Sequence, residues 1–471
     1  MSDIFSADGW LNRVVSASND FLWTYILVGV LIGCALYFTL RSRGVQFRMI
    51  GEMFRLLGES TGKHDKGRHV SSFQAFAVSV ATRVGTGNLA GVATAITIGG
   101  PGAVFWMWII ALLGSASAFV ESTLAQLFKK HHKGSFIGGP AYYILQGLRQ
   151  PALAALFAIL ISVTFGLSYN SIQSNTICSA LNVAFGFDTT VVGIVLAALS
   201  LVVIFGGIHR IARVSSVIVP IMALGYLLLA LFVIVRHFDL IPQVFTLIFK
   251  DAFGITQIAG GGIAATLMNG IKRGLFSNEA GEGSAPNVAA TASTSHPVKQ
   301  GLIQALGVFT DTLVVCSCTA FIILFSGVDL QDGPGGIALT QAALEMEVGR
   351  FGSIFIAAAI LLFAYSSIIG NYYYGEANIR FLTKKKWVMV LYRLLSGGVV
   401  VIFGALASLD LVWSLGDLCM ALLTACNLYA IVRLSKYAFR LLDDYRAQKK
   451  AGKDPVFHRS SLPELPLDCW E

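Results

Sequence analysis

The sequence predicts an all-α polytopic membrane protein with about eleven transmembrane helices. Composition is the first reason: 55% of the 471 residues are hydrophobic, only 13% are charged, and the mean hydropathy is +0.71. A soluble protein would carry about a quarter charged residues. The second reason is a series of apolar runs of roughly 20 residues, the length that crosses about 30 Å of hydrocarbon as a helix. The pI of 9.1 then indicates basic loops beside acidic membrane lipids rather than a nucleic-acid-binding surface.

The N-terminal region, residues 1–70, is predicted to hold one transmembrane helix, an amphipathic surface helix and a polar loop. The first span covers about Phe21–Leu40, and Gln46–Leu57 is expected to lie along the membrane surface. Residues 1–20 are mixed and polar, so no cleavable signal peptide is expected. A cytoplasmic tail is predicted over residues 437–471. The uninterrupted later spans are expected near Ala103–Phe128, Ala152–Ala180, Val191–Phe205, Ser215–Val235, Leu302–Phe325, Ile354–Arg380, Trp387–Ala407 and Leu411–Leu434.

The second span, about residues 73–98, is interrupted at its centre by the polar and glycine-rich stretch Arg83–Gly91. Unpaired backbone groups in hydrocarbon cost several kcal/mol each, so a broken helix survives only where it is buried in protein or lines a cavity. Freed carbonyls suit a cation and freed N–H groups suit a carboxylate. Glycines alone would favour the alternative interpretation, a site of close helix packing. Thr86 and Asn88 within the same stretch favour a binding site.

A second anomalous span, Gly260–Gly281, is short, rich in glycine and contains the turn dipeptide Asn269-Gly270. Two interrupted hydrophobic segments at matching positions are typical of an inverted-repeat secondary transporter. The first repeat would cover residues 71–236 and the second residues 254–436, with five spans in each.

Basic residues orient this arrangement. With eleven spans, five clusters fall on one side of the membrane, which the positive-inside rule makes cytoplasmic. The N-terminus is then outside and the C-terminus inside. The clusters are Arg41/Arg43/Arg48, Lys129/Lys130/Lys133, Arg210/Arg213, Arg380/Lys384/Lys385/Lys386 and the segment Arg433–Lys453.

Neither catalysis nor channel activity is favoured. The eight histidines fall in predicted loops, helix ends or the tail, without an HExxH motif, and the seven cysteines show no zinc-like pairing. No enzymatic activity is therefore expected. A channel can also use broken helices, but it conducts without stoichiometric coupling.

The glycine-rich motifs resemble those of the alanine or glycine:cation symporter family, and the likeness extends over nearly the whole chain. The resemblance implies a leucine-transporter-like 5+5 inverted repeat preceded by one extra helix. It also implies import of small neutral amino acids (alanine, glycine, possibly serine or larger) across a bacterial inner membrane, with Na⁺ as coupling ion and no organic cofactor. A proton-coupled carrier, or uptake of a larger amino acid such as glutamine, is the alternative. The motifs are Gly85–Ile96, Gly99–Ala103, Phe105–Trp108, Gly274–Gly281 and Gly283–Asn287.

The same resemblance implies a sodium site between the first broken helix and the span Ile354–Arg380. Adjacent hydroxyls on a membrane helix are usually bonded to the preceding turn, which is the alternative interpretation of this serine pair. Asn88 would ligate a second ion near the substrate carboxylate. The implied ligands of the first ion are the carbonyls of Ala81, Val84 and Phe363 and the hydroxyls of Ser366 and Ser367.

The amino acid is expected between the two breaks. Backbone N–H groups of the segment Gly85-Thr86-Gly87 would bind its carboxylate, and the second break, around Thr266 and Asn269, would bind its ammonium group. Gln173 resembles the glutamine of the family's pocket. Asn371 lies one turn beyond Ser367 on the same helix face, where members of the family often carry tryptophan. Strict selection for alanine or glycine is therefore in doubt.

Two charged residues are expected near mid-membrane, Arg83 and Asp311. Ionisable groups at this depth are costly and are usually paired or functional. We expect the two to form an intramembrane charge pair, with direct contact between Asp311 and ion or substrate as the alternative.

Overall fold

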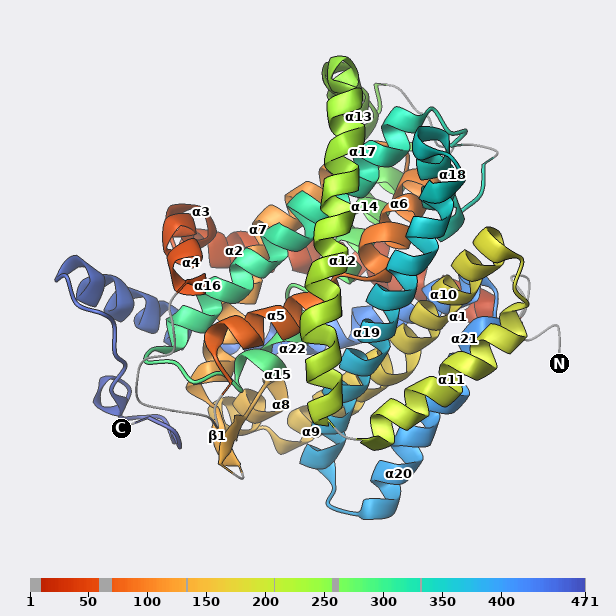
Figure 1. Cartoon of the computed structure of the whole chain (residues 1–471). Coiled ribbons are helices and arrows are strands. Elements are labelled where there is room, and N and C mark those ends of the chain that lie inside the picture. The colour runs from red at the N-terminus through yellow and green to blue at the C-terminus, as the bar shows by residue number, and fades with distance from the viewer. Residues whose placement is uncertain are drawn as a thin grey trace.

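The protein is a bundle of helices with one short hairpin, as the computed structural model shows (Figure 1). The structure describes residues 10–58, 70–132, 134–206, 208–255, 262–330 and 333–470. The strands named in these ranges are β1 (Lys130–His132) and β2 (Ser135–Ile137), which pair antiparallel. Lys133, the loop 63–69 and the glycines at 260 and 261 lie outside the described residues, as do the side chains of Arg210 and Arg213.

Helices of the first half follow the predicted spans closely. The short segments named η1, η2, η3 and η4 are π-helical turns that adjoin α-helices. The bounds are α1 (Trp10–Leu22), η1 (Trp23–Leu27), α2 (Val28–Arg41), α3 (Val45–Arg48), α4 (Ile50–Leu57), α5 (Ser72–Arg83), η2 (Gly87–Gly91), α6 (Val92–Gly99), α7 (Ala103–Leu127), α8 (Pro140–Tyr143), η3 (Ile144–Leu148), α9 (Pro151–Val163), η4 (Thr164–Tyr169), α10 (Asn170–Phe185), α11 (Thr189–Gly206) and α12 (Ile208–Arg236).

The second half of the chain begins after the bend that follows the end of α12 at Arg236. Its bounds are η5 (Phe238–Leu240), α13 (Ile241–Ala252), α14 (Gly262–Asn278), α15 (Ala285–Ala289), α16 (Pro297–Val308), η6 (Phe309–Cys316), α17 (Ser317–Ser326), α18 (Ile337–Val348), α19 (Arg350–Leu382), α20 (Lys386–Leu394), η7 (Leu395–Val399), α21 (Val400–Leu406), α22 (Leu409–Lys450) and η8 (Arg459–Ser461).

Within the described ranges, eight helices are long and apolar enough to cross a membrane, and a pair bent by 75° between α12 and α13 makes a possible ninth. The two predicted spans outside this set are the interrupted one, α5–η2–α6, and the short helix α14. The first is divided into short helical pieces by its break, and α14 has only 17 residues. The total of eleven spans stays a prediction.

The second break does not lie where the turn dipeptide predicted it. Helix α14 runs unbroken through Asn269-Gly270 and ends at Asn278, and the chain turns irregularly until α15 begins at Ala285. Asn269 donates to the Ala265 carbonyl at 2.9 Å, a bond compatible with the helix. Gly270 serves close packing, because a Cβ there would lie 2.5 Å from the carbonyl oxygen of Ala103. The predicted break at Asn269-Gly270 is therefore wrong.

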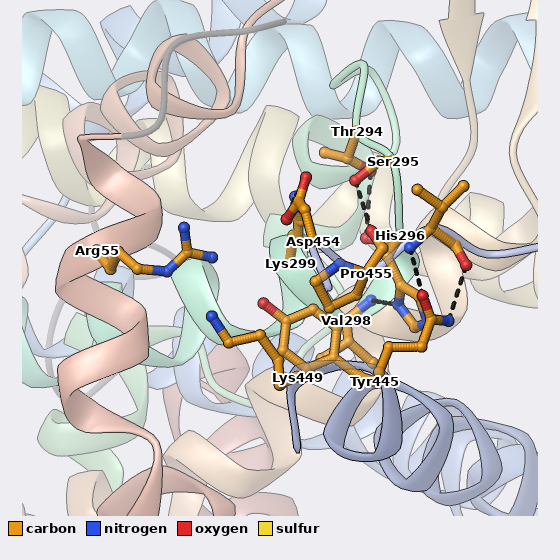
Figure 2. A network of polar contacts seen from close by, with 12 residues as sticks. Arg55, Thr294, Ser295, His296, Val298, Lys299, Tyr445, Lys449, Asp454 and Pro455 are labelled. Atoms are coloured by element: carbon orange, nitrogen blue, oxygen red, sulfur yellow. Dashed lines mark hydrogen bonds and ion pairs between the residues drawn. The ribbon is translucent and has the colours of Figure 1, made fainter. Parts of the chain in front are cut away.

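The predicted tail boundary at residue 437 falls inside a helix, since α22 is 42 residues long and ends at Lys450. The chain then turns back onto the ends of α7 and α16. The Phe457 N–H donates to the Ser295 carbonyl at 2.9 Å, and Lys299 pairs with Asp454 at 2.8 Å (Figure 2). Trp470 donates its indole N–H to the carbonyl of Gln126 at 3.2 Å. The C-terminal segment is thus a packed part of the structure.

Candidate functional site

The first break leaves backbone carbonyls at the end of α5. Val84 is extended (φ −69°, ψ 105°), and the Gly85 N–H donates to the side-chain oxygen of Asn88 at 2.9 Å. In a continuing helix that N–H would pair with the Ala81 carbonyl, so Asn88 diverts it. The freed carbonyls lie at the negative end of the helix dipole, which favours a cation.

Helix α19 places two hydroxyls against this end of α5. The oxygen of Ser366 lies 3.3 Å from the Ala81 carbonyl oxygen, and that of Ser367 lies 3.2 Å from the Thr82 carbonyl oxygen. Both hydroxyls also reach the Phe363 carbonyl, at 2.7 and 3.1 Å. The serines are therefore bonded to their own helix, as the alternative interpretation expected, and also directed at the break.

Of the predicted sodium ligands, the Ala81 and Phe363 carbonyls and the two serine hydroxyls are brought together in one cluster of neutral oxygens. Ser367 is fully buried, Ser366 is 9% exposed, and Phe363, Ala81 and Val84 are also buried. Carbonyls of unwound backbone and of helix C-terminal ends are the groups that coordinate sodium in transporters with broken helices. The arrangement suits a monovalent cation that must leave in every cycle.

The opposite side of the break offers N–H groups at the start of η2. Thr86 donates its hydroxyl to the Gln173 carbonyl oxygen at 2.6 Å. A Cβ on Gly85 would lie 2.7 Å from the Ser367 hydroxyl oxygen, and one on Gly87 would lie 2.9 Å from the Cα of Ser277. Glycine at both positions lets α19 and the end of α14 pack closely against the break, and a helix N-terminus favours a carboxylate.

Asn371 continues this face of α19 one turn beyond Ser367. It is 1% exposed, and its amide nitrogen has no hydrogen-bond partner in the part of the chain that the structure describes. A buried donor without a partner costs about 1–3 kcal/mol, which a bound ligand or water would recover.

Thr266 and Asn269 are not part of this cluster. Thr266 donates to the Gly262 carbonyl at 3.2 Å, and Asn269 packs against the C-terminal end of α6, where a Cβ on Gly99 would lie 3.0 Å from the Asn269 Cβ. Their predicted role depended on a break at Asn269-Gly270, which the structure does not contain. The part of α14 that approaches the first break is its last turn, Phe276 and Ser277.

Asp311 and Arg83 do not form the expected direct pair. The Asp311 carboxylate accepts from Asn88 at 2.7 Å, from Ser277 at 2.6 Å and from Thr312 at 3.1 Å. Among the described residues, the three guanidinium nitrogens of Arg83 have no hydrogen-bond partner. The hydrogen bonds to the Asp311 carboxylate thus come from neutral donors and not from an arginine. The sequence analysis missed Ser277, because a single serine forms no recognisable pattern.

Three aromatic rings pack against one another beside the first break. Phe276 lies between Tyr169 and Trp413, with ring centroids 4.7 and 4.8 Å apart, and a Cβ on Gly91 would lie 3.6 Å from the Trp413 ring. The sequence did not single out these rings, because aromatic residues in apolar spans are ordinarily core.

Comparison with solved structures supports the fold class. Two crystal structures of an Eremococcus coleocola manganese transporter superpose with TM-scores of 0.52 and 0.51 at 14% and 15% sequence identity, over 84% of each chain. At this identity the likeness shows the fold alone, and it confirms the predicted leucine-transporter-like class.

Comparison of sequences is more specific. The sequence model of the sodium:alanine symporter family matches residues 8–459. The chain is 52% identical to the probable sodium/glutamine symporter GlnT of Bacillus subtilis, over 98% of this chain and 96% of that one. It is 50% identical to the amino-acid carrier protein AlsT over 98% of both, and 43% identical to the putative sodium/proton-dependent alanine carrier protein YrbD over 97% of both, each from the same bacterium. The chain therefore belongs to the sodium:alanine symporter family and is a multi-pass membrane protein of the amino acid:cation symporter class.

Proposed function

We propose that this protein couples inward movement of sodium to import of small neutral amino acids, alanine and glycine among them, by alternating access. The observation that carries the proposal is the first break, where two hydroxyls of α19 meet freed carbonyls of α5. In this proposal the N-terminus is outside a bacterial inner membrane, the C-terminus is inside, and residues 71–236 and 254–436 are the two repeats.

The proposed ion and substrate sites share one side chain, which supplies a physical basis for coupling. Ser367 lies beside the Thr82 carbonyl on the ion side and beside Gly85 on the substrate side. An ion bound between α5 and α19 would hold the two helices at this separation and so fix the N–H groups that receive the carboxylate. Each ligand then favours binding of the other by the same coupling free energy.

The free energy released by sodium entry determines how far the amino acid can be accumulated. At about 100 mV one inward sodium ion releases roughly 2.3 kcal/mol, and a tenfold concentration gradient adds about 1.4 kcal/mol. One ion could sustain roughly 500-fold accumulation of a neutral amino acid. Labelled alanine uptake should be measured in proteoliposomes with sodium or choline outside, in vesicles that hold a proton gradient. Undiminished uptake in choline would contradict sodium coupling and would favour a proton-coupled carrier.

A larger neutral amino acid such as glutamine is a second candidate substrate. Asn371 supports it, because its buried amide nitrogen lacks a partner and could donate to a side-chain carbonyl. The relative named as a probable sodium/glutamine symporter also supports it. Competition of labelled alanine uptake by unlabelled glutamine, serine and glycine would rank these substrates.

A further inference from the structure

Four carboxylates surround the second break, and none of them belongs to the proposed sodium cage. Glu121 comes from α7, Glu279 and Glu282 lie in the irregular segment after α14, and Asp311 comes from η6. All four are at most 3% exposed. Burying an ionised carboxylate is costly unless hydrogen bonds or an opposite charge compensate it.

Two of these carboxylates are well compensated. Glu121 accepts from the Gly281 and Gly283 N–H groups at 3.2 and 3.1 Å and from Asn427 at 2.8 Å. Asp311 likewise accepts from three side-chain donors, as described above. Three donors hold a carboxylate in its ionised form.

Glu282 is compensated least. One of its oxygens accepts from the Tyr169 hydroxyl at 3.1 Å, and the other has no partner among the residues described. Glu279 also has a single donor within the described ranges, the hydroxyl of Ser284. An uncompensated charge is far more costly than an unpartnered neutral carboxyl group, so the contacts favour the protonated form of Glu282.

Positive charge in this region is scarce. Arg83 is the one basic group in electrostatic contact with all four carboxylates in the described part of the chain, and it donates a hydrogen bond to none of them there. Arg273, another buried arginine, is already paired with Asp417 at 2.6 Å. The single guanidinium of Arg83, 3% exposed and without a hydrogen-bond partner in the described part of the chain, cannot neutralise four carboxylates.

We propose that Glu282 is a proton-binding site of the transport cycle, which holds its proton while the second break is closed and releases it when water enters. A metal ion fits less well, since no group of three or more histidine, cysteine, aspartate or glutamate side chains in the described ranges is placed to hold one. The charged and titratable groups that face Glu282 are Glu279, Glu121, Arg83 and Tyr169.

The site is connected to substrate binding, and the inference rests on the proposed function. Tyr169, which donates to Glu282, packs edge-to-face against Phe276, with ring centroids 4.7 Å apart. Phe276 and Ser277 in turn lie against Gly87 in the first break. A movement of the first break on release of the amino acid would therefore displace the contact that covers Glu282.

The test compares the parent with Glu282→Gln, a neutral side chain of the same shape. Sodium-driven uptake in proteoliposomes should fall at alkaline pH in the parent, by about tenfold per pH unit for a single proton. Because glutamine cannot release a proton, Glu282→Gln should lose net sodium-driven uptake but keep exchange of internal for external alanine, and that exchange should not fall at alkaline pH. Infrared spectra of the purified protein should contain a protonated carboxyl band that is absent from the variant. Glu52→Gln, on the surface helix α4, is the matched control and should keep the parent's profile and band.

Several outcomes would overturn the proposal: net uptake by Glu282→Gln with the parent's pH profile, an unchanged infrared band, or a folded variant without alanine exchange at any pH. If the variant fails to fold, Tyr169→Phe decides. Loss of its hydrogen bond should stabilise the protonated form and move the alkaline limb to higher pH, and an unmoved limb would refute the site. Sodium dependence at one fixed pH tests the proposed function separately.

Discussion

Removing the hydroxyl of Ser366 or of Ser367 tests the proposed ion site most directly. Each hydroxyl lies within 3.3 Å of a freed carbonyl of α5 and within 3.1 Å of the Phe363 carbonyl. An interaction with a charged partner is worth about 1.5–3 kcal/mol, so each alanine variant should raise the sodium concentration for half-maximal uptake by roughly 10- to 150-fold. Substrate affinity at saturating sodium should change less in Ser366→Ala, because Ser367 is the residue that lies beside Gly85.

The assay is initial alanine uptake against sodium concentration in proteoliposomes. Ser115→Ala is the matched control, since the hydroxyl of Ser115 is bonded to the preceding turn of α7, to the Leu112 carbonyl at 3.0 Å. It should keep the parent's sodium curve. If Ser366→Ala and Ser367→Ala keep that curve as well, the two hydroxyls only satisfy their own helix, and the proposed ion site is wrong.

Three further predictions follow from the same geometry. Asn371→Trp places a larger side chain one turn beyond Ser367 and should keep alanine or glycine uptake while losing larger substrates, because one methylene changes binding by only about 1–3 kcal/mol whereas a steric clash excludes a substrate outright; an identical competition profile in parent and variant would contradict this. Thr86→Val removes the 2.6 Å bond to Gln173 and should raise the substrate concentration for half-maximal uptake roughly 5- to 150-fold, from about 1–3 kcal/mol, with little change in the sodium curve. Burial lowers the pKa of His296 to about 4, whereas the same histidine has a pKa of about 6.5 once release of the C-terminal segment exposes it to water. Protonation therefore favours the released state as the pH falls from about 6.5 to about 4, and residues 453–470 should become more sensitive to proteases over this range. Constant protection down to about pH 4 would refute the prediction.

The sequence was sufficient for the fold class and the first break because both depend on strong local signals. Long apolar runs predict membrane helices from length alone. The first break combines glycines with Thr86 and Asn88, and the structure shows why, since Asn88 diverts the Gly85 N–H that would otherwise continue the helix. Here the local sequence contains the cause of the break.

The second break was misplaced because its cause is tertiary. Asn269-Gly270 is a turn signal in isolation, but packing against Ala103 requires a glycine and the helix satisfies the asparagine. The actual break after Asn278 depends on Glu121, a residue far away in the sequence, which accepts the N–H groups of Gly281 and Gly283. A pattern confined to one segment cannot reveal such a partner.

The two breaks differ in a way that fits two kinds of cation. At the first break, neutral carbonyls and hydroxyls surround the proposed ion, and a neutral cage releases a monovalent ion more readily than a charged one would. At the second break, Glu121 replaces the missing helical partners of two backbone N–H groups. That carboxylate brings a buried charge, and Glu279 and Glu282 add two more acidic groups, each with one donor among the described residues. Carboxylates that stabilise one break favour binding of a positive charge there. A proton fits this site because it binds to a single carboxylate oxygen and needs no set of coordinating ligands.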